Sequence, residues 1–109
     1  MSFPGLRNLF GAVRRASPPP TGDGRLRTRG GDTIDLELYK KDNCPYCQRV
    51  YQTLARLDVR PRMRDILEDE GALAELVRVG GKKQVPCLFI DGKPLYESED
   101  IVRFLEEKF

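Results

Sequence analysis

The chain has 109 residues, a length typical of one domain, and 39% of them are hydrophobic and 33% charged. Its formal net charge of +2 does not indicate nucleic-acid binding, and the lack of histidine excludes Ser-His and Cys-His catalytic couples and histidine metal ligands. Three cysteines, two of them close together, and no apolar stretch of about 20 residues favour a cytoplasmic protein without a transmembrane helix or secretion signal.

Residues 1–32 are predicted to form a flexible, basic, Pro/Gly-rich N-terminal tail ahead of a domain that covers 33–109. The segment Ser17–Gly24 contains three consecutive prolines, which neither a helix nor a paired strand accommodates. Over 3–15, apolar side chains fall near one helical face and arginines fall elsewhere. Such a segment can make weak contact with an anionic membrane surface; the alternative is a partly disordered leader that docks loosely on the domain.

The first half of the domain has the pattern strand, helix, strand. Apolar and polar side chains alternate over 34–39, which indicates a strand, and the period then lengthens to 3.6 residues over 45–57, which indicates a helix. Residues 59–64 alternate again, and Pro61, which has no N–H for a ladder, marks an edge strand. We expect the two strands to be parallel and joined by a right-handed crossover.

A short helix is predicted over 70–79. Its apolar face is expected to consist of Leu73, Leu76 and Val77, and Gly80 is a suitable C-terminal cap.

The second half of the domain ends in a hairpin and a helix. The apolar run 85–90 predicts a buried strand, and Asp91-Gly92 predicts a tight turn into an antiparallel strand over 93–96. Ser98 can cap a final helix. The predicted fold is therefore α/β, in the order β-α-β-α-β-β-α, with a four-stranded mixed sheet flanked by three helices.

The segment Cys44-Pro45-Tyr46-Cys47 places two thiols at a helix start after a strand. With Cys44 at the N-cap and Pro45 at the first helical position, the free N–H groups of Tyr46 and Cys47 point toward the Cys44 sulfur. These donors, the positive helix end and nearby Lys41 stabilise a thiolate, so Cys44 is the expected nucleophile. Cys47, one turn further into the helix, is the expected resolving thiol.

The thiol pair has two other interpretations. A zinc site normally needs four Cys or His ligands, and three cysteines without histidine do not supply them, so no metal is expected. Two incidental buried cysteines would have no reason to lie at a helix start.

Val85-Pro86 is a second unusual step, because proline rarely enters a core strand. A cis bond there would leave the Val85 backbone free to pair with a peptide, whereas the alternative is a proline that merely begins a strand. Cys87 follows directly, and is either a small buried residue or a third reactive thiol. Lys82 and Lys83 are expected to be solvated.

The segments LYKKDNCPYC (38–47) and VPCLFIDG (85–92) resemble those of dithiol glutaredoxins. The resemblance covers about residues 34–109 and implies the thioredoxin fold, a cis Pro86 and glutathione as co-substrate. It further implies that Lys41 contacts a glutathione carboxylate and that the Val85 backbone pairs with the cysteine unit of the tripeptide. Tyr46 and Pro86 complete the implied binding surface.

One segment departs from the glutaredoxin pattern. Residues 95–101, LYESEDI, are more similar to the Glu-Ser motif of glutathione transferase N-terminal domains. There the Glu and Ser hold the γ-glutamyl ammonium and carboxylate, which implies the same roles for Glu97 and Ser98. The alternative is that Ser98 caps its helix and Glu97 complements the helix dipole.

The predicted function is a glutathione-dependent thiol–disulfide oxidoreductase that acts through Cys44 on glutathionylated or disulfide-bonded proteins and small disulfides. It is expected to be monomeric. Two alternatives stay open: a carrier of a [2Fe–2S] cluster held by Cys44 and glutathione, and a transferase-like domain that binds glutathione without turnover.

Overall fold

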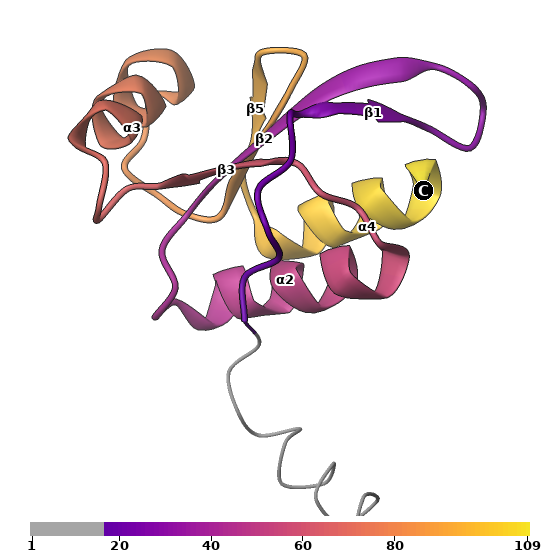
Figure 1. Cartoon of the computed structure of the whole chain (residues 1–109). Coiled ribbons are helices and arrows are strands. Elements are labelled where there is room, and N and C mark those ends of the chain that lie inside the picture. The colour runs from indigo at the N-terminus through magenta and orange to yellow at the C-terminus, as the bar shows by residue number, and fades with distance from the viewer. Residues whose placement is uncertain (1–16) are drawn as a thin grey trace, which may run out of the picture.

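The structure is a computed structural model that describes residues 17–109 of the chain. The amphipathic segment predicted over 3–15 lies outside the described residues. Figure 1 shows a sheet with helices on both faces. The elements in chain order are β1 (Arg25–Arg27), β2 (Thr33–Lys40), α2 (Pro45–Leu57), β3 (Arg62–Asp65), α3 (Glu70–Glu75), the π-helical turn η1 (Leu76–Gly80), β4 (Cys87–Ile90), β5 (Lys93–Leu95) and α4 (Ser98–Lys108).

The central strand of the sheet is β2. It pairs in parallel with β3 and antiparallel with β4, and β4 pairs antiparallel with β5. This arrangement confirms the predicted mixed sheet and its order of elements from β2 onward. Within residues 17–109 the sheet has five strands rather than four, because β1 pairs antiparallel with the start of β2.

Helices cover both faces of the sheet. Leu36 and Leu38 of β2 and Leu88 of β4 pack with α2 and α4 in one buried cluster. Tyr39 and Phe89, one residue further along the same strands, pack on the opposite face with α3 and η1, and their ring centroids lie 4.7 Å apart. The two-residue period of each strand thus separates two cores. Figure 1 shows α2 and α4 side by side beneath the sheet and α3 apart from them.

The helix α2 covers the predicted range 45–57. Pro45 occupies its first turn, where a missing N–H costs no hydrogen bond, and Cys44 is the extended N-cap residue with φ −101° and ψ 121°. Asp58 ends the helix in the left-handed conformation, with φ 56°. The prediction of a helix that begins immediately after Cys44 is confirmed.

The predicted boundary between tail and domain was placed too late in the chain. Besides β1, the N–H of Gly22 donates to the Pro61 carbonyl at 3.0 Å, and Thr21 Oγ1 accepts from the N–H of Met63 at 3.0 Å. Segment 17–24 has no helix or strand, as expected, but residues 21–32 belong to the folded domain. The sequence did not reveal β1 because a strand of three residues is too short for an alternation signal.

Arg29 joins this segment to the C-terminus of α4. Its Nη2 donates to the carbonyls of Glu106 at 3.1 Å and Glu107 at 2.6 Å, and its backbone N–H donates to the Lys108 carbonyl at 2.7 Å. The last carbonyls of a helix have no partners within the helix, so Arg29 satisfies them from a distant part of the chain.

The helix predicted over 70–79 differs from the structure in its second half. After α3 the chain continues as η1, and the wider turn rotates the following side chains. Ala72 and Leu76 are fully buried, whereas Val77, expected on the apolar face, is 43% exposed. The left-handed residue that ends the turn is Gly81 (φ 94°) rather than Gly80.

The three remaining strand predictions were right in kind and too long. β3 lies at the edge of the sheet as predicted, but begins at Arg62, after Pro61. β4 begins at Cys87, after the proline, and β5 ends at Leu95. The turn between β4 and β5 is the predicted one, with positive φ at both Asp91 (49°) and Gly92 (85°).

Candidate active site

The two thiols of the motif lie at the N-terminus of α2, against the loop that precedes β4. The Cys44 thiol donates to the Val85 carbonyl across 3.9 Å, a long contact that joins the two segments expected to act together. The Cys44 N–H donates to the Lys41 carbonyl at 3.3 Å and closes the turn before the helix. The Val85-Pro86 bond is cis, as the sequence comparison with glutaredoxins implied.

Cys44 and Cys47 differ in their access to solvent. Cys44 is 6% exposed, whereas Cys47 is fully buried. Burial, together with the neighbouring Cys44, raises the pKa of the Cys47 thiol to about 12. Cys47 is therefore held as a neutral thiol at neutral pH, and Cys44 is the less deeply buried of the two thiols.

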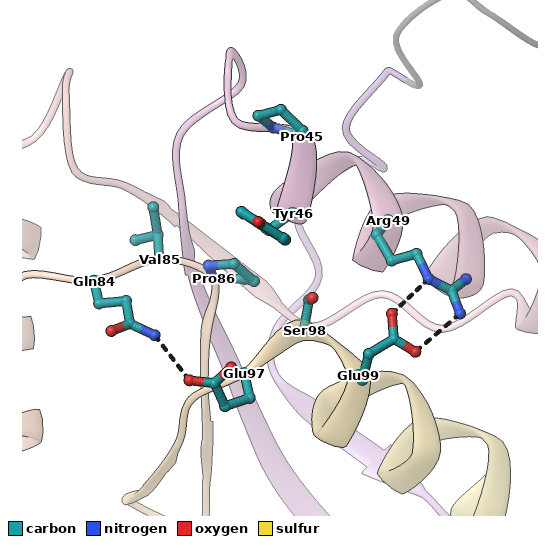
Figure 2. A pocket seen from close by; sticks show the side chains of 9 residues that line it. All are labelled: Pro45, Tyr46, Arg49, Gln84, Val85, Pro86, Glu97, Ser98 and Glu99. Carbon is teal, nitrogen blue, oxygen red and sulfur yellow. Dashed lines mark hydrogen bonds and ion pairs between the residues drawn. The ribbon is translucent and has the colours of Figure 1, made fainter.

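A cavity of about 690 Å³ opens beside the thiol pair. This volume is in the usual range for a small-molecule site, about 300–1,000 Å³. Figure 2 shows its lining, which comes from α2, from the loop before β4 and from the start of α4. The lining residues are Pro45, Tyr46, Arg49, Gln84, Val85, Pro86, Glu97, Ser98 and Glu99.

Most of the predicted binding residues meet in this cavity. Tyr46, Val85, Pro86, Glu97 and Ser98 all line it. Lys41 does not line it; it is half-buried in the turn that leads to Cys44. Tyr46 is 65% exposed and forms an apolar surface beside the thiols.

The start of α4 is built differently from the simple cap that Ser98 suggested. Glu97 takes the N-cap position in an unusual conformation, with φ 70° and ψ 112°, and its side chain makes no capping hydrogen bond. Ser98 is the first helical residue and is mostly buried. Glu97 instead accepts a hydrogen bond from Gln84 Nε2 at 3.4 Å (Figure 2). Backbone strain of this kind clusters at functional sites.

Both helices begin at the cavity. Pro45 opens α2 and Ser98 opens α4, and both residues line the same space. The N-terminus of a helix carries a partial positive charge and unpaired N–H donors, so two of them favour anionic groups of a ligand. The Glu97 carboxylate adds negative charge, and Arg49 and Glu99 add one charge of each sign, which suits a ligand that carries both signs.

Arg49 and Glu99 were not identified from the sequence. Arg49 Nε donates to Glu99 Oε2 at 2.9 Å and Nη2 donates to Oε1 at 3.2 Å, a bidentate pair at the cavity wall (Figure 2). The hydrogen bond from Arg49 holds the pKa of Glu99 below its ordinary value. The available signal was that Arg49 lies one helical turn beyond Pro45 and Tyr46 on the predicted helix.

A partly buried polar network fixes the loop before Cys44. Asp42 Oδ1 accepts from Tyr51 Oη at 2.6 Å and from Lys40 Nζ at 2.8 Å, and Lys40 also contacts Asp65 at 3.2 Å. The Asp42 carbonyl accepts from Gln48 Nε2 at 2.6 Å. Burial opposes the charge of Lys40, but these carboxylates hold its pKa above the ordinary value. The network ties β2, β3 and α2 to the turn that carries Cys44.

The third cysteine belongs to the core. Cys87 is the first residue of β4 and is fully buried against Tyr39 and Phe89. Burial raises the pKa of its thiol to about 11. These surroundings fit the first of the two readings of Cys87, a small apolar strand residue.

The comparisons with known proteins agree with this geometry. A family model described as Glutaredoxin matches residues 36–95. The chain is 31% identical to Glutaredoxin-C4 of Arabidopsis thaliana, over 89% of this chain and 73% of that protein. It is 28% identical to Glutaredoxin 3 of Escherichia coli K12, over 62% of this chain and 81% of that protein.

Solved structures give the same fold. A glutaredoxin C1 from Populus tremula x tremuloides, solved in its holo form, superposes with a TM-score of 0.54 at 24% identity, over 66% of this chain and 74% of that one. A Tau class glutathione S-transferase from mango superposes with a TM-score of 0.54 at 28% identity, over 67% of this chain and 33% of that one. The thiol motif, the fold and the family match together show that the chain belongs to the glutaredoxin family, thiol–disulfide oxidoreductases of the thioredoxin superfamily.

Proposed function

We propose that this glutaredoxin uses glutathione to reduce protein–glutathione mixed disulfides and small disulfides, with Cys44 as the nucleophile. The observation that carries the proposal is the cavity lined by Pro45, Val85, Glu97 and Ser98, because the Val85 carbonyl also contacts the Cys44 thiol. A γ-glutamyl tripeptide has its thiol in the middle and a zwitterionic amino-acid group at one end, which matches this order of groups.

Each part of glutathione has a partner of suitable chemistry. The Val85 backbone pairs with the cysteine unit beside Cys44. The Glu97 carboxylate binds the γ-glutamyl ammonium, and the Ser98 hydroxyl and the first N–H groups of α4 bind the γ-glutamyl carboxylate. Tyr46 and Pro86 supply apolar contacts. Lys41 reaches the glycine carboxylate from the rim, outside the cavity lining.

The reaction begins at a protein–glutathione mixed disulfide. The Cys44 thiolate attacks the glutathione sulfur; a Cys44–glutathione bond forms, the protein–glutathione bond breaks, and the protein leaves as a thiolate that takes up a proton. A second glutathione thiolate then attacks the glutathione sulfur attached to Cys44. Oxidised glutathione leaves and the Cys44 thiolate is regenerated, so each turnover consumes one free glutathione, and the other half of the oxidised glutathione comes from the substrate.

The second step has an alternative in which Cys47 attacks Cys44, releases glutathione and leaves a Cys44–Cys47 disulfide. The burial of Cys47 and its pKa of about 12 leave little thiolate at neutral pH. We therefore propose that the monothiol route, through a second glutathione, carries most of the turnover. Because the reaction consumes reduced glutathione, we place it in a reducing compartment such as the cytoplasm.

The test is glutathione-dependent reduction of a glutathionylated peptide by the wild type and three variants. Cys44→Ser should abolish turnover, whereas Cys47→Ser should retain most of it. Cys87→Ala is the matched control, because Cys87 lies in the opposite core and should not affect the rate.

Other outcomes would contradict the proposal in distinguishable ways. Loss of turnover in Cys47→Ser would replace the monothiol route with the dithiol route. A wild type that binds glutathione but does not turn over would leave a binding domain. An iron–sulfur chromophore in the purified protein that needs Cys44 and glutathione would favour the cluster carrier.

A further inference from the structure

Two ion pairs join α2 and α4 at matching positions. Arg49 pairs with Glu99 through two hydrogen bonds of 2.9 and 3.2 Å, and Arg56 pairs with Glu106 at 2.6 Å. The two arginines are separated from each other by seven positions on α2, and the two glutamates are separated by seven positions on α4. Seven residues make about two helical turns, so the pairs lie on one face of each helix and the helices run parallel.

Only one of the two pairs lies at the cavity. Arg49 and Glu99 line it, whereas Arg56 and Glu106 lie near the other ends of the helices. Figure 2 shows the Arg49–Glu99 pair bridging α2 and α4 beside Ser98. The helix that carries Cys44 at its start is thereby tied to the helix that carries Ser98 at its start.

We propose that the Arg49–Glu99 pair fixes the separation of these two helix starts and so sets the affinity and selectivity for substrates with a γ-glutamyl group. The inference rests on the proposed glutathione site. A ligand held at both its sulfur and its γ-glutamyl end binds well only if the two subsites stand at the right distance, and a preformed distance saves the cost of ordering them. A bidentate Arg–carboxylate pair restricts orientation as well as distance.

This role predicts an effect that depends on the substrate. A peptide disulfide-linked to glutathione must occupy both subsites, whereas the same peptide linked to cysteine occupies only the subsite at Cys44. Loosening the pair should therefore weaken binding of the first substrate and leave the second unchanged. Arg49 and Glu99 act as positioning residues, since neither is needed at the sulfur atoms.

The experiment compares Arg49→Gln, Glu99→Gln and the double variant with Arg56→Gln and Glu106→Gln in the full chain. Each of the first three should raise the KM for the glutathionylated peptide by about threefold to fivefold, in keeping with an exposed pair, and change kcat less. The double variant should be no worse than either single one, because the same interaction is lost once. The Arg56 and Glu106 variants should keep the wild-type KM for the glutathionylated peptide. For the cysteine-linked peptide, all five variants should keep the wild-type KM.

Three results would overturn the inference. An equal rise in KM for Arg56→Gln would show a general effect of helix packing. A rise in Arg49→Gln without one in Glu99→Gln would show that Arg49 contacts the ligand by itself. A rise for both peptides would show that the γ-glutamyl subsite is not involved. Failure of the proposed function is separate from all three, because the wild type itself would then show no glutathione-dependent turnover.

Discussion

At the scale of single residues, the site depends on a difference in burial between two thiols of the same motif. Cys44 and Cys47 are separated by less than one helical turn, yet Cys44 is 6% exposed beside the cavity-lining Pro45 and Val85, whereas Cys47 is fully buried. The Tyr51–Asp42 hydrogen bond of 2.6 Å fixes the turn that makes this difference, because it anchors the residues just before Cys44 to the interior of α2. A short hydrogen bond to a carboxylate is among the stronger ones in proteins.

These surroundings predict selective alkylation. Burial raises the pKa of Cys47 to about 12 and that of Cys87 to about 11. A thiol with a raised pKa stays protonated up to higher pH, and only the thiolate reacts, so neither should be labelled near neutral pH. Iodoacetamide should add one label to the native chain, at Cys44, and three after unfolding, as counted by mass spectrometry. Cys44→Ala should remove the native label.

Rapid native labelling of Cys47 or Cys87 would contradict this assignment. The rate at which iodoacetamide labels Cys47 and Cys87 should rise only in alkaline solution, as the pH approaches the raised pKa values of these two thiols.

At the scale of elements, the sequence predicts what is encoded locally. The helix α2 matched its predicted range because its proline, its cap residue and its apolar period all fall within 44–58. Two elements, β1 and η1, do not follow from the local side-chain pattern. β1 exists only as a partner of β2, and the π turn η1 shifts Val77 outward although the side-chain pattern fits a regular helix.

The same distinction applies to the site. Cys44, Val85 and Glu97 stand in recognisable local motifs; the structure brings Val85 and Glu97 to one cavity and places the Cys44 thiol against the Val85 carbonyl. The Arg49–Glu99 pair joins residues 50 positions apart, so no local pattern could reveal it. Binding of glutathione by these residues stays a prediction.

Arg29 offers a test of whether a side chain from a distant part of the chain stabilises the C-terminus of α4. Its guanidinium donates to the carbonyls of Glu106 and Glu107 at the end of α4. Arg29→Ala should lower the free energy of unfolding by about 0.5–1 kcal/mol, since exposed contacts of a cation with a helix C-terminus are worth about that much. Urea denaturation measures it. Arg27→Ala is the control, because Arg27 is exposed in β1 and should leave stability unchanged.

Equal stability of the Arg29 and Arg27 variants would show that water replaces the side chain as the partner of these carbonyls without loss. Turnover should be the same in both, since the C-terminus of α4 is far from Ser98 at its start.

At the scale of the whole molecule, the domain consists of two cores on opposite faces of one sheet and an N-terminal segment that covers one end, and the thiol pair belongs to the α2–α4 core. The α2–α4 layer carries the cavity, and the α3–η1 layer packs on the other face of the same sheet. Residues 21–32 close the end of the domain away from the cavity, where they contact Pro61, Met63 and the last turn of α4. Stability and chemistry thus depend on different parts of the chain.

This separation is tested by comparing a chain that starts at Ser17 with one that starts at Asp32. The shorter chain loses the β1–β2 ladder, the packing of Leu26 against the core and the contacts of Arg29. We expect its thermal midpoint to fall by about 10 °C, because each kcal/mol lost shifts a domain of this size by about 4–8 °C. At a temperature where both chains are folded, turnover should be equal, because every residue that lines the cavity remains. Equal midpoints would instead mean that residues 17–31 are the dispensable tail that their composition indicates, and unequal turnover of the folded chains would mean that the segment also supports the site.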